Sequence, residues 1–598
     1  MKILRLNRMK TLNNKILIGL AALVLSAGLI IGCSDSFLDG PPQGSLDEVT
    51  LSNPAGVEAN LIASYRVLGG WFAGVGGWGA ASSNWPFGSI TSDDAYKGSE
   101  NLDQPDANDL ELYLWSLPGA HNYLNDKWRS QWEGVSRTNS TIRLLNTVLA
   151  NDPGAMGPVQ ANGIRGEALF LRAHYHFEAW KIWGNVPYYK EDDTDFRKSN
   201  VGVDVIANVL ADLDEAINLL PDTPRNGEVG RVTRWTARAY KGRVQAYTND
   251  WQGALTTLRE VRNSGPYALE QNYHRVWTGF AEFANGPETI LAFQASANDG
   301  NPEGDNANWG ERLNFPHGGS PFGCCGFHQP SHNLVNFFRT DANGLPLPLT
   351  QPNNWNTIGT NLTAEVSADL PLDPRLDWTV GRDGVPYKDW GAHASGWIRD
   401  PSFGGPYSPK KNVHEQASGA ESAVGWVPTQ LNSVNLHLYR YADMLLLLAE
   451  AEVEVGSLEN AREIVNQIRA RAAAGAQGPG TDAGSISVPI DHPSITWADY
   501  RVGLYEQPWA NQATAREAVR IERRLELAME GHRYFDLRRW GQLQDVLNSY
   551  VQTERARIPN LQSAGSLENR HQWYPIPNIQ IQLSRVDGQD RLVQNDGW

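Results

Sequence analysis

Apolar residues recur every three or four positions over long stretches of the chain, which is the period of an amphipathic helix. This pattern predicts helices over residues 127–149 and 163–183. A further helix is expected to begin at Asp204, an acceptable N-cap residue, and to end before Pro221. The hydrophobic pattern therefore indicates a protein built mainly from helices.

Two further helix pairs are predicted, each joined by a short loop. They cover residues 235–247 with 251–262, and residues 441–455 with 459–471. In both pairs the first helix carries a small residue. The second helix has one contact residue twelve positions after it and another contact residue four positions further on. This is the interval between close-packed helices of tetratricopeptide repeats, although any antiparallel helix hairpin needs similar small contacts. The matching positions are Gly242, Ala254 and Leu258 in the first pair, and Ala449, Ala461 and Val465 in the second.

The periodicity fades between residues 265 and 435, where Pro and Gly become frequent. We expect this region to be a loop-rich insertion with short strands, set between helical blocks at about 51–264 and 436–598. Long loops inside a compact protein are often functional. A second, flexible insertion is expected over residues 475–500. The three large regions are interpreted as one domain, 51–598.

The N-terminal residues are typical of an export signal. Five basic residues and no acidic ones occur among residues 1–32, which also contain an apolar run from Ile16 to Ile31. Gly32-Cys33 follows, and the segment resembles a bacterial lipobox, in which the cysteine becomes the lipidated first residue. We therefore expect a signal peptide at 1–32, a lipid-anchored tether at 33–50 and lipidation at Cys33. An uncleaved membrane anchor is the alternative, because the apolar run approaches the roughly 20 residues of a spanning helix.

The charge balance opposes nucleic-acid binding. The net charge is −16, and removal of residues 1–32 would change it to −21, because that segment carries five basic residues. Binding to a phosphate backbone needs clustered Lys and Arg, so a nucleic-acid partner is not expected. No segment after the signal is apolar enough to cross a bilayer.

Several motifs distributed along the whole chain resemble those of the SusD-like (RagB/SusD) outer-membrane lipoproteins. The first begins at the lipobox cysteine, and the last ends at the final residue. The matching runs are Cys33 to Asp39, Ser92 to Tyr96, Arg165 to Phe177, Trp183 to Pro187, Tyr439 to Asp443, Glu522 to Ala528, Gly531 to Gly541, Pro575 to Pro577 and Gln594 to Trp598.

The resemblance implies a fold dominated by α-helices: a tetratricopeptide-like superhelix with long loop-rich insertions and a few short strands. It also implies a lipid-anchored protein of the outer membrane that faces the cell exterior. Such a protein binds glycan on a loop-rich face and acts as the lid of a SusC-like TonB-dependent β-barrel transporter. It would not be an enzyme and would need no cofactor. A peptide ligand and, less favoured, a secreted glycoside hydrolase are the alternatives.

Glycan recognition requires exposed aromatic rings beside polar side chains. Most tryptophans on helices are expected to be core residues, whereas loop tryptophans lie at the surface. Two segments combine loop character, Trp and polar neighbours, and the resemblance places a binding face there. A packed loop anchor or a transporter contact is the alternative for each residue. The candidates are Trp71, Trp78, Asn84 and Trp85 in the first segment, and Trp309 and Arg312 in the second.

Two adjacent cysteines, Cys324 and Cys325, follow Phe322 in a Gly/Pro-rich loop. An exported compartment permits disulfides. We expect that an oxidised pair would lock a tight turn and, together with Phe322, could provide a rigid apolar surface beside the tryptophan loops. A purely structural kink is the alternative.

The remaining chemistry-bearing patterns are expected to be structural. The alternating oxygen side chains of Asp299, Asn301, Glu303 and Asp305 resemble a calcium loop, but Gly310 stands where the bidentate Glu belongs, so a solvated loop is favoured. Residues 520–539 carry many charges, which predict an ion-pair network. His174 and His176 lie two positions apart on a predicted helix, so they point in different directions; a shared metal is not expected, and both are expected to be packing residues.

Overall fold

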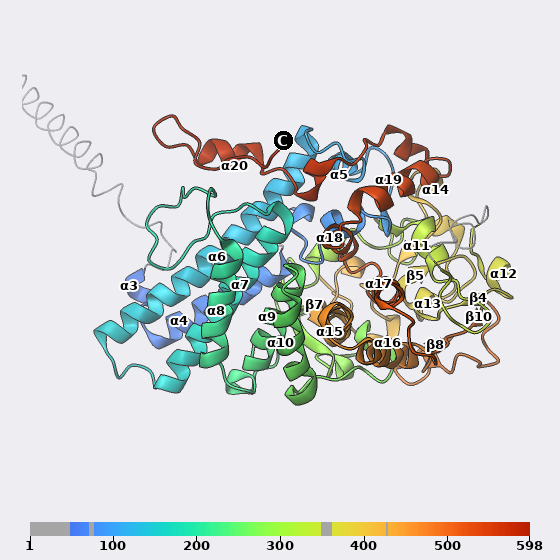
Figure 1. The fold of residues 1–598 in the computed structure, drawn as a ribbon, viewed down its shortest axis with the longest axis horizontal. Coiled ribbons are helices and arrows are strands. Elements are labelled where there is room, and N and C mark those ends of the chain that lie inside the picture. The colour runs from blue at the N-terminus through green and yellow to red at the C-terminus, as the bar shows by residue number, and fades with distance from the viewer. Residues whose placement is uncertain (1–47, 71–76, 349–360, 426–427) are drawn as a thin grey trace, which may run out of the picture.

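The computed structural model describes residues 48–70, 77–348, 361–425 and 428–598. Most helices of its first half are stacked side by side in the left half of Figure 1, whereas α5 (Pro105–Glu111) is drawn further to the right. The prediction of a mainly helical first block is confirmed. These helices are α3 (Glu48–Leu51), α4 (Pro54–Arg66), α5 (Pro105–Glu111), α6 (Pro118–Asn151), α7 (Pro158–Trp183), α8 (Val205–Leu219), α9 (Arg234–Tyr247) and α10 (Trp251–Ser264).

Short side-chain caps define where several of these helices begin. The Asp204 carboxylate accepts the backbone N–H of Ala207 at 2.9 Å, and α8 ends at Leu219, as the position of Pro221 predicts. Asp250 caps α10 in the same way. An N-cap carboxylate satisfies an N–H group that has no partner within the helix.

The two predicted helix pairs are present as α9 with α10, and as α15 (Tyr441–Val455) with α16 (Leu458–Ala472). Gly242 of α9 faces Leu258 of α10, and a Cβ atom on Gly242 would lie only 2.6 Å from the Leu258 Cγ. Only glycine permits this approach of the two helices. Ala449, Ala461 and Val465 are buried at the corresponding contact of the second pair.

Strands and short helices make up the loop-rich half, at the right of Figure 1. Antiparallel β2 (Thr289–Phe293) and β7 (Leu436–Arg440) pair with two register shifts, and they bring the two ends of the predicted insertion together. The other strands form two-stranded sheets: β1 (Ala95–Gly98) with β3 (Phe327–Pro330), β4 (Pro371–Leu372) with β10 (Asp499–Tyr500), β5 (Val380–Gly381) with β6 (Ser408–Pro409), and β8 (Ala476–Gln477) with β9 (Ser487–Val488).

The remaining helices are α11 (His332–Phe337), α12 (Ala364–Ser367), α13 (Arg375–Thr379), α14 (Pro401–Gly404), α17 (Gln512–Leu527), α18 (Arg533–Arg539), α19 (Leu543–Glu554) and α20 (Asn578–Leu583). The segment 475–500, which the sequence suggested to be a flexible insertion, contains β8, β9 and β10. Its Trp497 and Tyr500 side chains are buried, and the Trp497 indole donates to the Tyr500 hydroxyl at 2.9 Å. The Tyr500 hydroxyl also donates to the Asp377 carboxylate, and this contact holds the segment against the rest of the protein.

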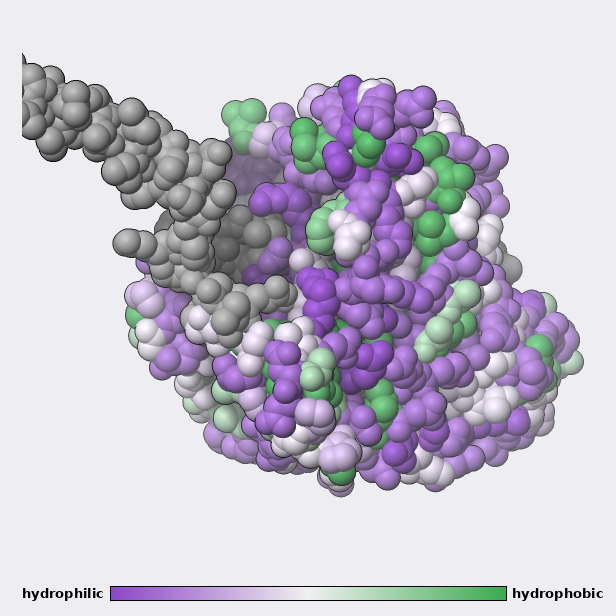
Figure 2. All heavy atoms as spheres, turned by 90° about the vertical axis from the view of Figure 1, so that its left-hand side faces the viewer, coloured by the Kyte–Doolittle hydropathy of each residue, from purple (hydrophilic) through white to green (hydrophobic). Residues whose placement is uncertain are grey.

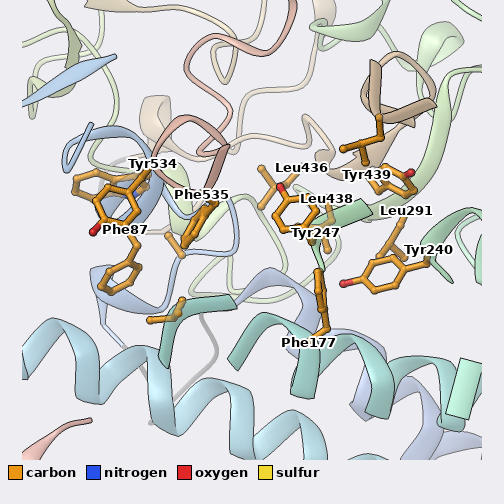
Figure 3. Packing of buried hydrophobic residues seen from close by; sticks show 14 of the residues in the cluster. Phe87, Phe177, Tyr240, Tyr247, Leu291, Leu436, Leu438, Tyr439, Tyr534 and Phe535 are labelled. Atoms are coloured by element: carbon orange, nitrogen blue, oxygen red, sulfur yellow. The ribbon is translucent and has the colours of Figure 1, made fainter. Parts of the chain in front are cut away.

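A continuous aromatic core joins the helical block to the β2–β7 strands. Phe177 of α7 packs edge-on against Tyr240 and Tyr247 of α9, and Tyr240 contacts Tyr439 of β7 (Figure 3). Leu291 of β2 lies beside the same rings in that view. The insertion therefore begins and ends on a rigid, buried platform.

The charged run of the last block forms a buried ion-pair network, as predicted. Arg440 donates to Glu288 and to Glu526, in each case at 2.7 Å, and Arg375 donates to Glu526 at 3.0 Å. Arg471 also pairs with Glu526. Burial alone would raise the pKa of Glu526, but Arg471, Arg440 and Arg375 outweigh it and hold that pKa well below its usual range. The network links the insertion to α16 and α17.

The surface around the α3–α8 end of the molecule is mainly hydrophilic, with only small apolar areas (Figure 2). In the part of the chain that the structure describes, every helix is too short or too polar to cross a membrane.

Candidate ligand-binding face

Trp78 and Trp309, which are far apart in the sequence, stack on each other. Trp78 lies on the 3₁₀ turn η2 (Trp78–Ala80) and Trp309 on η7 (Trp309–Glu311). Their ring centroids are 6.2 Å apart and their planes differ by 17°. Trp78 is half-buried, whereas Trp309 retains an exposed fraction of 9%. The structure thus brings together two of the predicted binding residues, and Trp78 is the more accessible one.

Local contacts fix the position of each ring. Gly79 packs against α6, where a Cβ atom would lie 2.8 Å from the Tyr123 Cα, so η2 can sit this close only because the residue is glycine. The Trp309 indole N–H donates to the Gly304 carbonyl at 2.9 Å. A rigid aromatic ring loses little conformational entropy when it binds a ligand.

Arg312 lies against both rings of the pair. Its guanidinium carbon is 4.7 Å from the Trp309 ring centroid and 5.9 Å from that of Trp78. The Arg312 side chain is fully buried, and burial lowers its pKa to about 10. The sequence placed Arg312 in direct contact with ligand. The structure corrects this prediction, because a buried guanidinium reaches a ligand only through the rings that it supports.

Trp85 and Asn84, two other predicted contacts, belong to the core. Trp85 is fully buried, and its indole N–H donates to the Gly310 carbonyl at 3.2 Å, so it supports the turn that carries Trp309. Asn84 is 4% exposed and donates to the Glu178 carboxylate at 3.0 Å. The prediction was wrong for both, since the Gly/Ser-rich segment turns inward after Ala80 and forms a buried π-helical turn over Trp85–Ser89.

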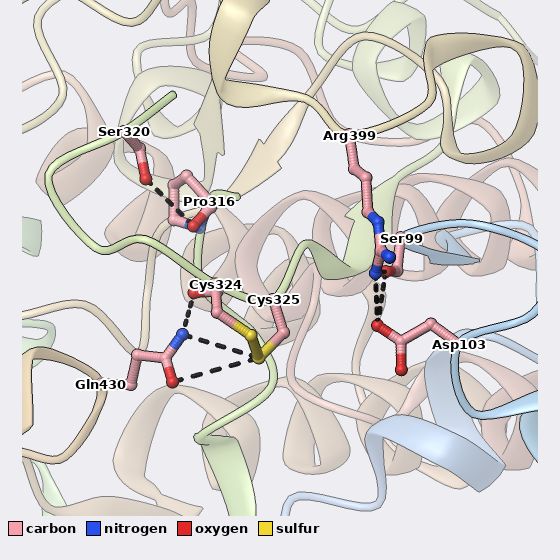
Figure 4. The surroundings of a disulfide bond; sticks show 8 residues. All are labelled: Ser99, Asp103, Pro316, Ser320, Cys324, Cys325, Arg399 and Gln430. Carbon is pink, nitrogen blue, oxygen red and sulfur yellow. Dashed lines mark hydrogen bonds and ion pairs between the residues drawn. A yellow bond between two sulfur atoms is a disulfide. The ribbon is translucent and has the colours of Figure 1, made fainter. Parts of the chain in front are cut away.

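Cys324 and Cys325 form a disulfide (Figure 4). Cys325 is buried and Cys324 is half-buried. The Gln430 amide donates to the Cys324 carbonyl, and its Nε2 lies 3.6 Å from the Cys325 sulfur. The next residue, Leu431, packs in one cluster with Trp309 and Trp78. Residues 430–431 therefore connect the disulfide to the aromatic pair.

Phe322 is 1% exposed and is part of a separate aromatic cluster, so the prediction that it forms a binding surface is corrected. Trp390 packs on Phe322 with a centroid distance of 4.8 Å and is itself half-buried. The Trp390 ring therefore covers Phe322, which the sequence predicted to form an exposed apolar surface. Trp390 is recognisable from the sequence as a loop tryptophan, but Gln430 was missed, because it has no local sequence signal and its partner Cys324 is distant along the chain.

Two predicted functional residues, Trp71 and Cys33, lie outside the described residues. The suggested calcium loop is internally hydrogen-bonded. Asp299 Oδ1 accepts the Asn301 N–H at 3.1 Å, and Asn301 Oδ1 accepts the Glu303 N–H at 2.9 Å. Within the ranges described, no three His, Cys, Asp or Glu side chains are grouped as a metal site would require. These contacts support the solvated loop.

Two family models match most of the chain. The model described as the SusD family matches residues 287–598, which include Trp309 and the disulfide. A second model, described as starch-binding associating with outer membrane, matches residues 60–245, which include Trp78. The chain belongs to the SusD family. The resemblance carried by the sequence motifs is therefore confirmed.

Similar SusD-family proteins cover nearly the full length. The SusD-like protein P38 of Formosa agariphila is 24% identical over 540 residues, covering 88% of this chain and 91% of that protein. A crystal structure of a SusD homolog from Bacteroides thetaiotaomicron has a TM-score of 0.63 at 19% identity, covering 92% and 99% of the two chains. Surface glycan-binding protein A of the same organism, solved in complex with laminarihexaose, has a TM-score of 0.59 at 19% identity over 91% and 99%.

These structural similarities confirm the helical fold of the SusD family, with its few short strands. Both members of the aromatic pair lie in matched segments, Trp78 in the second model and Trp309 in the first. The face on which they stack is thus built where the two matched regions meet.

Proposed function

We propose that this SusD-family chain binds a polysaccharide or its oligosaccharide fragments at the cell surface. The observation that carries the proposal is the Trp78–Trp309 stack, whose rings are held in place by a buried arginine and by neighbouring backbone. Pyranose rings have flat apolar faces, and an aromatic ring that is rigid and partly exposed suits such a face. Asp299 and Asn306, which lie near this turn in the sequence, form an exposed hydrogen-bonded pair at 2.8 Å and supply polar groups for hydroxyls.

The proposal includes an anchor and a partner. Cys33 would carry lipid that holds the protein to the outer membrane, facing outward. The bound glycan would pass to a SusC-like TonB-dependent transporter, for which this protein acts as a lid. The description of the second family model, which names association with the outer membrane, supports the location. Binding without catalysis is favoured, because a structurally similar protein is described as a surface glycan-binding protein.

The test is electrophoresis of the chain lacking residues 1–33 through gels that contain a panel of polysaccharides. We expect selective retardation by one glycan. Trp78→Ala should then lower affinity by about 2 kcal/mol, or roughly thirtyfold, as expected for a binding hot spot. The panel should include laminarin, since a related protein binds laminarihexaose.

Trp235→Ala is the matched control. Trp235 on α9 is also half-buried and also lies against an arginine, Arg238, at 5.3 Å, but it lies on a helix and not on the turns that carry Trp78 and Trp309. It should retain wild-type affinity. Wild-type affinity in Trp78→Ala would remove this face from the proposal, and passage through every gel without retardation would contradict glycan binding itself.

A further inference from the structure

A cleft of about 640 Å³ lies between α17 and α19, with α11 and α18 at its ends. These four helices are grouped in the right half of Figure 1. The cleft is lined by a set of residues different from the candidate ligand face. Its size is suitable for a small ligand.

The α17 wall of the cleft carries three arginines and one carboxylate, that of Glu517. Arg516, Arg520 and Arg524 follow one another at intervals of four residues, so they lie along one face of the helix. The outer two have carboxylate partners: Arg516 pairs with Glu454 at 2.7 Å, and Arg524 pairs with Asp94 at 3.0 Å. Their charges are therefore compensated by the protein itself.

Arg520, which lies between Arg516 and Arg524, differs from both in its charge compensation. Within the described ranges no carboxylate forms an ion pair with Arg520, and its buried Nε has no hydrogen-bond acceptor. The guanidinium lies over the Trp540 ring at 4.8 Å, which fixes its position at the cleft wall. Burial lowers its pKa from the usual value despite attraction by Glu450. An anion in the cleft would supply the hydrogen bonds and the charge that Arg520 lacks.

The opposite wall, on α19, carries one carboxylate, that of the exposed Asp545, followed by small neutral polar groups. Ser549 and Thr553 are four residues apart, exposed, and line the cleft together with Gln542 at the start of the helix. Val546 and Tyr550 provide an apolar surface between them. A ligand that fits both walls has an anionic group on one side and hydroxyl groups on the other.

We propose that this cleft binds an acidic sugar: a ring bearing a carboxylate or a sulfate, with the anionic group at Arg520 and its hydroxyls toward Ser549 and Thr553. The site is separate from the Trp78–Trp309 face and does not depend on the proposed function. A carboxylate and a sulfate present the same oxyanion chemistry to a guanidinium.

The test is titration calorimetry of the full-length chain in mild detergent with galacturonic acid, galactose 6-sulfate, galactose and sodium sulfate. We expect one or both acidic sugars to bind and galactose not to bind. Arg520→Gln should weaken that binding by about tenfold or more, the loss expected for a charge-assisted hydrogen bond. Arg238→Gln is the control, because Arg238 also lies over a tryptophan but pairs with Glu260 at 2.6 Å.

A second variant keeps the test decisive if Arg520→Gln fails to fold. Ser549→Asp, at an exposed helix position, places a negative charge opposite Arg520 and should abolish binding of the acidic sugar. Equal affinity for inorganic sulfate would overturn the sugar assignment, and no heat with either acidic sugar would overturn the site. Trp78→Ala should leave this binding unchanged, so failure here is distinguishable from failure of the proposed glycan face.

Discussion

Tryptophan side chains with similar sequence surroundings have different roles in this protein. The role of each depends on how much of its ring is buried. Trp78 and Trp85 are seven residues apart in the same Gly/Ser-rich segment. Trp78 keeps part of its ring at the surface, while Trp85 is fully buried and hydrogen-bonds the turn that carries Trp309. One ring is available to a ligand and the other positions its stacking partner.

His176 offers a prediction about pH. Its Nδ1–H donates to the Arg172 carbonyl at 2.9 Å, and its Nε2 accepts the Tyr189 N–H at 3.1 Å. Both ring nitrogens are used in the neutral form, and burial lowers the pKa of His176 to about 3. The unfolded chain takes up a proton below about pH 6.5 whereas the folded protein does not, so stability is lost as pH falls from 6.5 toward 3.

We expect His176 to contribute a loss of about 1.4 kcal/mol in unfolding free energy between pH 7.5 and 5.5. Denaturant unfolding at both pH values, for the wild type and His176→Gln, measures this contribution. The variant should show a correspondingly smaller difference between the two pH values. An identical pH dependence in the two proteins would mean that folding does not change the pKa of His176.

At the scale of elements, the contact between α9 and α10 depends on the absence of a side chain at Gly242. The Gly242 Cα faces Leu258 so closely that an added Cβ would overlap the Leu258 side chain. Overpacking of this kind typically costs about 1–3 kcal/mol, although alanine is favoured over glycine within a helix by roughly 1 kcal/mol.

A double-mutant cycle tests this contact. Leu258→Ala alone should destabilise by about 2–5 kcal/mol, because it leaves a cavity. Gly242→Ala should also destabilise, and the double variant should lose less stability than the sum of the two, since the new methyl group occupies the space of the leucine. If the loss of stability in the double variant equals the sum of the losses in the two single variants, then Gly242 and Leu258 do not set the distance between the two helices.

The same elements show what the sequence could predict. Helices such as α8, and the paired helices around Gly242 and Ala449, follow from local periodicity, caps and the spacing of small residues. The strand pair β2–β7 joins residues about 150 positions apart with an irregular register, and no local pattern indicates such a pairing. The same holds for the candidate site. Trp78 and Trp309 were identifiable from the sequence as loop tryptophans. The inward turn that buries Trp85 was not, because it depends on Gly310, more than 200 residues away.

At the scale of the whole molecule, distant segments contribute to a single face. The turn with Trp78 comes from the helical block, whereas Trp309 and Gln430 come from the insertion that β2 and β7 close. The insertion is tied to the helices by the aromatic core and the buried ion-pair network, so the loops proposed to bind ligand stand on a rigid base. Such preorganisation reduces the entropic cost of binding.

The cysteines of the chain allow the proposed anchoring to be tested. The chain has three, and Cys324 and Cys325 are bonded to each other, so Cys33 is the thiol that remains for lipid. Stable attachment requires more than one acyl chain, since each buried methylene contributes only about 0.8 kcal/mol. We expect Cys33→Ala to lose both fatty-acid labelling and co-sedimentation with the outer membrane.

Cys325→Ser serves as the control, because it removes a cysteine from the folded domain and leaves the lipobox intact. It should be labelled as strongly as the wild type in cells supplied with a labelled fatty acid. If Cys33→Ala were labelled equally, lipidation at that residue would be excluded. If it lost the label but still sedimented with the membrane, the apolar run from Ile16 to Ile31 would be holding the protein as an uncleaved anchor, and the mass of the mature N-terminus would then include residues 1–32.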